Sequence, residues 1–243
     1  MSTMLRPAVA ALLIALAATG CSGPTEPAEP DDVVLVEPVP TDVPSCWPAD
    51  GLAFEAGTEA DSATIVVLGE GDRGIVLGPQ NTQSMCQWAA QAERLADQGY
   101  RVASFTWTAD GSIAFRAAVA VLADLGARDY ALVGASKGGA YAAGMSTLLE
   151  PAPVAVVALG PPDEFGIDAR YESVGFAGPL LVIASTDDAS VDVEASRRVA
   201  RPDDPASFVE LSGSAHGVAL FDGEHRAEVE ELIDGFLAAA FGG

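Results

Sequence analysis

The chain has 243 residues, 49% of them hydrophobic, and carries 12 Lys and Arg against 35 Asp and Glu, for a net charge of −23. This size and apolar content suffice for one domain with a substantial core. The acid excess argues against a nucleic-acid-binding protein, because phosphate backbones require clustered Lys and Arg. It also disfavours attraction of the protein to anionic lipid by charge.

The N-terminus has the pattern of an export signal. Arg6 precedes an apolar run over residues 8–18, which is short for a membrane span but typical of a signal peptide. Small residues then lead to Cys21, and this stretch resembles a bacterial lipobox, although Ala18 stands where Leu is commoner. We therefore expect a lipoprotein signal peptide at 1–20, a diacylglyceryl group on Cys21, and anchoring at the outer face of a bacterial cell membrane. The alternative is ordinary secretion with a chance cysteine.

Residues 21–45 are rich in Pro, Asp and Glu. Proline disfavours helices and central strands, and like charges repel, so we expect an extended tether before a single domain at 46–243. Cys46 and Cys86 are the cysteines that remain in that domain. Export permits a disulfide between them, which we favour over two buried thiols.

The domain alternates strand and helix patterns. Apolar runs predict strands at 52–54, 64–68, 74–77, 101–105, 130–133, 154–159, 180–184 and 208–211. Helical spacing of apolar residues predicts helices over 85–95 and 115–125, after residue 136, and over 229–241. Repeated βα units predict an α/β fold with a mostly parallel, doubly wound sheet.

The first chemical motif is a G-x-S-x-G sequence centred on Ser136. Gly134 and Gly138 flank this serine, and the motif lies between a predicted strand and a predicted helix. That context is typical of a nucleophile elbow, a sharp turn that holds a serine hydroxyl at the edge of a sheet. The alternative is a serine that only caps the following helix.

A nucleophilic serine needs a base, and the chain has two histidines. His216 follows the last predicted strand in a Gly-Ser-Ala-His-Gly loop, so we predict that it is the base. His225 lies among charged residues at the start of the final helix, and we expect it on a solvated face.

The acid that orients this base is predicted in the loop after the strand at 180–184. We favour Asp188, because the spacing from Asp188 to Val191 is common in such loops, and Asp187 is the close alternative. Asp163 or Glu164, after the preceding strand, is a more distant alternative. Acids without this role are expected in loops and helix caps.

These motifs resemble the α/β-hydrolase superfamily, and within it small dienelactone-hydrolase-like proteins. The resemblance covers residues from about 46 to 241, through Trp88 and the stretches 74–77, 92–96, 99–102, 132–139 and 213–217. It implies a Ser-His-Asp triad of Ser136, His216 and Asp188, with no cofactor and no metal. The short segment between residues 159 and 180 predicts an α/β-hydrolase fold without a large lid.

Two stretches depart from these relatives. Many relatives have His-Gly after the strand that ends at Leu77, where this chain has a Gly-Pro-Gln-Asn loop. That loop normally supplies one amide of the oxyanion hole, and the amide of Lys137 is expected to supply the other. Because Pro79 has no N–H, the loop donor must come from Gln80, Asn81 or Thr82. The second departure is at 106–110, which lacks the Arg and Gly residues usual there and changes the expected pocket rim.

Lys137 is the single lysine of the chain. Its side chain either contacts a substrate carboxylate or is a solvated ammonium, and the sequence leaves both open. The sequence therefore predicts a serine hydrolase acting on a small ester, thioester or amide. The alternatives are a non-catalytic, lipid-anchored binding module on the same fold, or an acyltransferase of the cell envelope.

Overall fold

The computed structural model describes residues 33–242, which contain a nine-stranded sheet in the order β1-β2-β3-β5-β4-β6-β7-β8-β9. The strands are β1 (Val36–Pro40), β2 (Leu52–Gly57), β3 (Ser62–Leu68), β4 (Arg73–Gly78), β5 (Arg101–Phe105), β6 (Asp129–Ala135), β7 (Ala155–Leu159), β8 (Leu180–Ser185) and β9 (Phe208–Leu211). Neighbours from β5 to β9 in this order pair in parallel, whereas β1, β2 and β3 join through antiparallel pairs. The sheet is therefore mostly parallel, as predicted.

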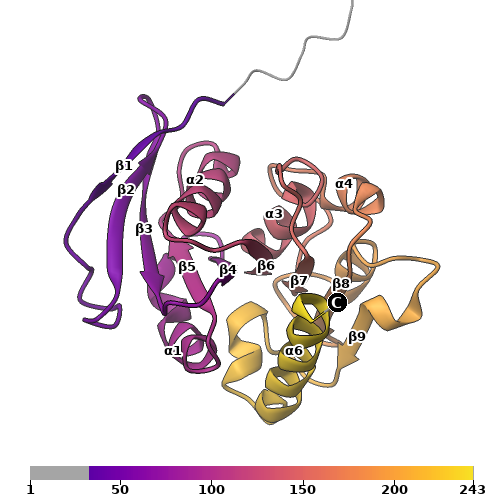
Figure 1. Ribbon diagram of the computed structural model, residues 1–243. Coiled ribbons are helices and arrows are strands. Elements are labelled where there is room, and N and C mark those ends of the chain that lie inside the picture. The colour runs from indigo at the N-terminus through magenta and orange to yellow at the C-terminus, as the bar shows by residue number, and fades with distance from the viewer. Residues whose placement is uncertain (1–32, 243) are drawn as a thin grey trace, which may run out of the picture. The chain divides into compact units, whose positions relative to one another are not determined.

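Helices cover both faces of the sheet (Figure 1). They are α1 (Ala89–Asp97), α2 (Gly111–Asp124), α3 (Lys137–Met145), α4 (Ala169–Gly175), α5 (Val193–Arg197) and α6 (Arg226–Phe241), with short 3-10 turns η1 (Met85–Trp88), η2 (Pro205–Ser207) and η3 (Gly217–Phe221). One apolar core contains residues of α2 and α3, and the other contains residues of α1 and α6. The sheet therefore separates two layers of helices.

The central strands are buried on both faces, which explains their continuous apolar runs. Within β3, Ile65 and Val67 belong to the core under α2, and Val66 belongs to the opposite core. Successive side chains of a strand point to opposite faces, so both faces must be apolar when helices cover both.

The predicted tether is too long at its C-terminal end. Residues 33–45 belong to the described domain, and β1 pairs antiparallel with β2, from Val36 opposite Gly57 to Pro40 opposite Phe54. The prediction failed because a proline-rich segment can still form a strand at the edge of a sheet. Pro38 and Pro40 are tolerated because β1 lies at the edge of the sheet, where a missing N–H removes no necessary pairing.

A disulfide joins Cys46 to Cys86, with 5.4 Å between their Cα atoms. It connects the segment before β2 to η1, so the favoured pairing of these cysteines is present. The predicted signal peptide, the predicted lipidation site Cys21 and the first part of the predicted tether lie outside the described residues.

The connection between β7 and β8 contains only the short helix α4, so no large lid interrupts this part of the chain. Sequence periodicity did not predict α4 or α5, which are seven and five residues long.

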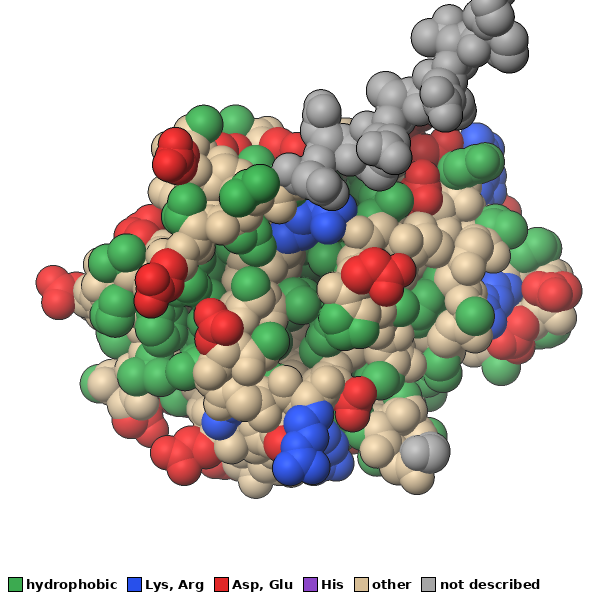
Figure 2. All heavy atoms as spheres, turned by 45° about the horizontal axis from the view of Figure 1, so that its top comes forward, with side chains coloured by type: hydrophobic (Ala, Val, Ile, Leu, Met, Phe, Trp, Pro, Cys, Tyr) green, Lys and Arg blue, Asp and Glu red, His purple; other side chains and the backbone are tan. Residues whose placement is uncertain are grey.

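In the described part of the chain, no helix has the length and hydropathy needed to cross a membrane. Figure 2 shows acidic side chains spread over one face of the molecule, in keeping with 35 acids against 12 basic residues.

Candidate active site

Ser136 lies in the sharp turn between β6 and α3, with φ of 52° and ψ of −118°. Among the non-glycine residues at 33–242, only Ser136 and Thr82 have a positive φ. The Ser136 N–H donates to Leu159 O at the end of β7, over 2.8 Å. A strained backbone angle held by its surroundings is the local structure expected of a nucleophile elbow.

This turn requires glycines because the start of α3 packs closely against β4 and β6. A Cβ at Gly134 would lie 2.0 Å from Gly138 O, and a Cβ at Gly138 would lie 2.1 Å from Gly78 O. No side chain fits at either distance, so only glycine allows β4, β6 and α3 to approach this closely. The two glycines of the motif are therefore required by the close packing of this fold.

Asp188 and His216 form a direct pair at the same edge of the sheet. Asp188 Oδ2 lies 2.6 Å from His216 Nδ1, and the two side chains are 1% and 18% exposed. The other carboxylate oxygen, Oδ1, accepts the N–H groups of Ser190 and Val191 at 2.8 and 3.2 Å. This arrangement favours the tautomer with the proton on Nδ1, which leaves Nε2 of His216 free to accept a proton.

The alternative acids lie elsewhere. Asp187 is exposed, and only its backbone N–H is engaged, by Gly213 O at 2.9 Å. Asp163 accepts a hydrogen bond of 2.7 Å from Arg198, which lowers the pKa of that carboxyl. Glu164 is exposed. Of the acids considered, Asp188 is thus the one in contact with His216.

Ser136 and His216 both lie beside the residues that follow β7. Leu159 O accepts the Ser136 N–H, and a Cβ on the next residue, Gly160, would lie 3.2 Å from His216 Nδ1 and 3.3 Å from Asp188 Oδ2. No hydrogen bond within residues 33–242 joins the Ser136 hydroxyl to His216. Hydrogen bonds between a nucleophile and its base often tighten only in the complex with substrate, so Ser136 and His216 remain candidates for one catalytic site.

The loop after β4 carries the predicted oxyanion donors. Trp107 Nε1–H donates to Gln80 O over 3.1 Å, and the side-chain oxygen of Gln80 accepts the Val218 N–H at 3.3 Å. The Gln80 N–H lies 2.9 Å from the side-chain oxygen of Gln87, in the amide orientation that also satisfies Trp88. Gln80 is therefore hydrogen-bonded through three of its groups, two of which belong to the backbone.

Asn81 is freer than Gln80 to donate its amide. Gln83 N–H donates to Gln80 O over 3.2 Å, which closes a turn with Thr82 at φ 59°. Asn81 is exposed, and no acceptor for its N–H lies within the described part of the chain. A β-branched residue at positive φ is strained, as often found in functional loops. At the facing helix, Lys137 is the first residue of α3, where N–H groups have no intrahelical acceptor.

The Lys137 side chain lies on an aromatic surface. Its Nζ is 3.7 Å from the centre of the Trp107 ring and 5.7 Å from that of Tyr141. Burial lowers the pKa of Lys137 from its ordinary value. Sequence analysis predicted no partner within the chain for this lysine, although Trp107 in the loop after β5 was an available signal.

His225 differs from the solvated residue that the sequence predicted. Its Nε2 lies 3.0 Å from Ser212 Oγ and its Nδ1 lies 3.0 Å from Glu228 Oε2, and its side chain is 24% exposed. These contacts arise because the loop after β9 folds back onto the start of α6. Ser212 lacks the positive φ of Ser136, so this second Ser-His-acid set has no elbow.

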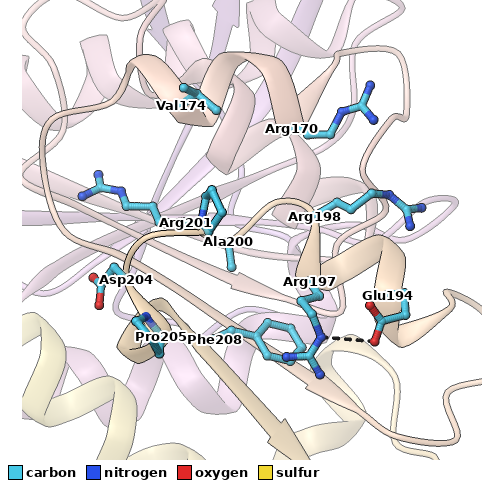
Figure 3. A pocket seen from close by; sticks show the side chains of 11 residues that line it. Arg170, Val174, Glu194, Arg197, Arg198, Ala200, Arg201, Asp204, Pro205 and Phe208 are labelled. Carbon is cyan, nitrogen blue, oxygen red and sulfur yellow. Dashed lines mark hydrogen bonds and ion pairs between the residues drawn. The ribbon is translucent and has the colours of Figure 1, made fainter.

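A separate hollow of about 560 Å³ lies beside β9 and α5 (Figure 3). Arg170, Arg197, Arg198 and Arg201 line it around Phe208. Arg197 pairs with Glu194 at 3.1 Å, Arg198 pairs with Asp163, and Arg201 donates to Phe176 O at 2.6 Å. Ser136, Asp188 and His216 do not line this hollow. Three of its arginines lie together at 197–201 in the sequence, and only the fold brings Arg170 beside them.

No protein-family model matches this chain, and no curated protein matches its sequence. Solved structures do match. An esterase from Pyrococcus furiosus has a TM-score of 0.65 at 17% identity, covering 82% of this chain and 97% of its own. A monoacylglycerol lipase from Paleococcus ferrophilus has 0.63 at 16% identity, covering 72% and 98%.

The esterase domain of a Rhodothermus marinus protein has a TM-score of 0.62 at 22% identity, covering 76% of this chain and 96% of that domain. Identities this low establish the fold and not the activity. The chain therefore has the α/β-hydrolase fold that the sequence predicts.

Proposed function

We propose that this protein is a serine hydrolase that cleaves a carboxylic ester through an acyl-enzyme. The observation that carries the proposal is the contact between the buried carboxylate of Asp188 and His216, 2.6 Å between Oδ2 and Nδ1, on the same sheet edge as the strained Ser136 turn. The esterases and the lipase among the structural neighbours support it, because their chemistry is performed on the same fold.

The proposed reaction has two steps. Ser136 Oγ attacks the carbonyl carbon while His216 Nε2 takes the hydroxyl proton, and the imidazolium then gives this proton to the departing alcohol. Water repeats the sequence on the acyl-enzyme and releases the acid and Ser136. Asp188 holds the ring and stabilises the imidazolium, and the amides of Lys137 and Asn81 bind the developing oxyanion.

This function is tested by hydrolysis of p-nitrophenyl butyrate. Wild-type protein is expected to release nitrophenol with saturating kinetics, and Ser136→Ala to lose about 10⁶-fold in kcat, because removing the nucleophile removes the whole triad's contribution. The matched control is Ser212→Ala, which removes the serine hydroxyl that is bonded to His225 and should retain the wild-type rate.

A non-catalytic binding module is the second candidate. It is supported by Pro79, which has no N–H, and by the engagement of the Gln80 N–H with Gln87, which together reduce the loop's supply of oxyanion donors. Absence of turnover in wild-type protein, with the Ser136→Ala variant indistinguishable from it, would favour this candidate over the hydrolase.

We also propose that Cys21 is lipidated and anchors the protein to the outer face of a bacterial membrane. The support is the apolar run at 8–18, the small residues before Cys21 and the acidic, Pro-rich residues after it. Wild-type protein is expected in the membrane fraction, and Cys21→Ala in the soluble fraction or unprocessed. A mature N-terminus other than Cys21, carrying no lipid by mass spectrometry, would contradict the anchor.

A further inference from the structure

The side chain of Lys137 is a cation without an anionic partner beside the proposed nucleophile. The chain has 35 Asp and Glu residues, yet no ion pair in the described range 33–242 includes Lys137. Its neighbours are instead the rings of Trp107 and Tyr141. Aromatic faces attract an ammonium without neutralising it, so the three N–H donors keep their capacity for an acceptor.

The aromatic surface is fixed in place. Trp107 donates its indole N–H to Gln80 O over 3.1 Å, and its ring contacts Tyr141 with 5.2 Å between the centroids. Tyr141 is 7% exposed, and a Cβ at Gly111 would lie 2.6 Å from its ring, so this ring has little freedom to move. The ammonium therefore lies against a fixed aromatic surface, beside the loop that carries the predicted oxyanion donors.

The place of Lys137 relative to Ser136 and His216 indicates which half of an ester substrate it would contact. Trp107 follows β5, Ser136 follows β6 and His216 follows β9, in a sheet where β6 lies between β5 and β9. His216 must stand on the side of the leaving alcohol, because it gives that alcohol a proton. Lys137 and Trp107 lie on the other side of Ser136, where the acyl half of the substrate remains.

We propose that Lys137 binds a carboxylate on the acyl half of the substrate, so that the enzyme prefers half-esters of dicarboxylic acids over neutral esters. This inference rests on the proposed hydrolase function. A carboxylate matches the site because a single ammonium balances a single negative charge, and an ionic hydrogen bond in a half-buried place is stronger than one in water. The chain as a whole has an excess of acidic residues, whereas the charge that Lys137 places beside Ser136 is positive.

The test compares two esters within each variant: p-nitrophenyl hydrogen adipate, which is anionic, and its methyl ester, which is neutral. The measured quantity is the ratio of kcat/KM for the anionic ester to kcat/KM for the neutral one, corrected for spontaneous hydrolysis. Losses common to both esters cancel in this ratio. Wild-type protein should favour the anionic ester, and Lys137→Met should lower the ratio about tenfold or more, the usual effect of losing one charged hydrogen bond.

Two further variants separate charge recognition from structure. Lys137→Arg should retain most of the ratio, because it keeps the charge. Arg128→Met removes a cation that is 81% exposed at a distant surface and should leave the ratio unchanged. A wild-type ratio at or below one, or an equal loss for both esters in Lys137→Met, would overturn the inference while leaving the hydrolase intact. Hydrolysis of neither ester would overturn the hydrolase itself and this inference with it.

Discussion

Replacing His216 by alanine is expected to lower kcat for simple aryl esters by about 10⁶-fold, the same loss as that expected for Ser136→Ala. The serine hydroxyl is a poor nucleophile near neutral pH without a base, and His216 is the histidine paired with a buried carboxylate at this sheet edge. The double variant with Ser136→Ala should lose little more than either single variant, because the residues act as a unit. The measurement is steady-state hydrolysis of p-nitrophenyl butyrate, with circular dichroism to confirm folding.

The matched control for this prediction is His225→Ala. Like His216, His225 pairs with a carboxylate, Glu228 at 3.0 Å, and it also contacts Ser212 at 3.0 Å, but Ser212 does not lie in an elbow. We expect His225→Ala to retain the wild-type rate. If His225→Ala abolished hydrolysis while His216→Ala did not, the assignment of the base would be wrong.

Replacing Asp188 by asparagine is expected to lower kcat by about 10²–10⁴-fold without unfolding the domain. The asparagine oxygen can still accept the N–H groups of Ser190 and Val191, which turns its NH₂ toward His216 Nδ1. Nδ1 must then accept a hydrogen bond, so the ring proton moves to Nε2. A protonated Nε2 cannot take the proton of Ser136, and the base is lost while the ring stays in place.

Asp187→Asn is the control for Asp188→Asn, since it makes the same change at the adjacent, exposed carboxylate. It should leave kcat near the wild-type value. Equal losses in the two variants would show that local loop damage, and not the tautomer of His216, causes the effect. Rates are compared at the same pH, with the melting temperature of each variant measured beside them.

Periodicity and glycine spacing predicted most of the strands and helices in their order along the chain. They did not predict the strand at the edge of the sheet. The buried runs of β3, β6, β7 and β8 are covered on both faces, so their sequence carries a strong signal. β1 carries two prolines and pairs on one side only, so its sequence reads as a linker. Short helices such as α5 depend on caps and tertiary contacts more than on an apolar stripe.

For the candidate site, sequence analysis predicted which residues take part, but not the contacts between them. Asp187 and Asp188 are adjacent, and only the path of the loop decides which carboxylate is buried against His216. The contact between Lys137 and Trp107 joins the start of α3 to the loop after β5, thirty positions earlier, and no local pattern predicts such a pairing. The engagement of Gln80 by Gln87 and Trp107 likewise needed the fold.

The most direct test of the account is the identity of the residue that reacts with a fluorophosphonate probe. Wild-type protein is labelled, digested and mapped by mass spectrometry, beside Ser136→Ala and Ser212→Ala. One adduct is expected, on Ser136, that is absent from Ser136→Ala and present in Ser212→Ala, because Ser136 is the one serine at 33–242 with the positive φ of an elbow. An adduct on Ser212, labelling that persists in Ser136→Ala, or no adduct in the wild-type protein would contradict it.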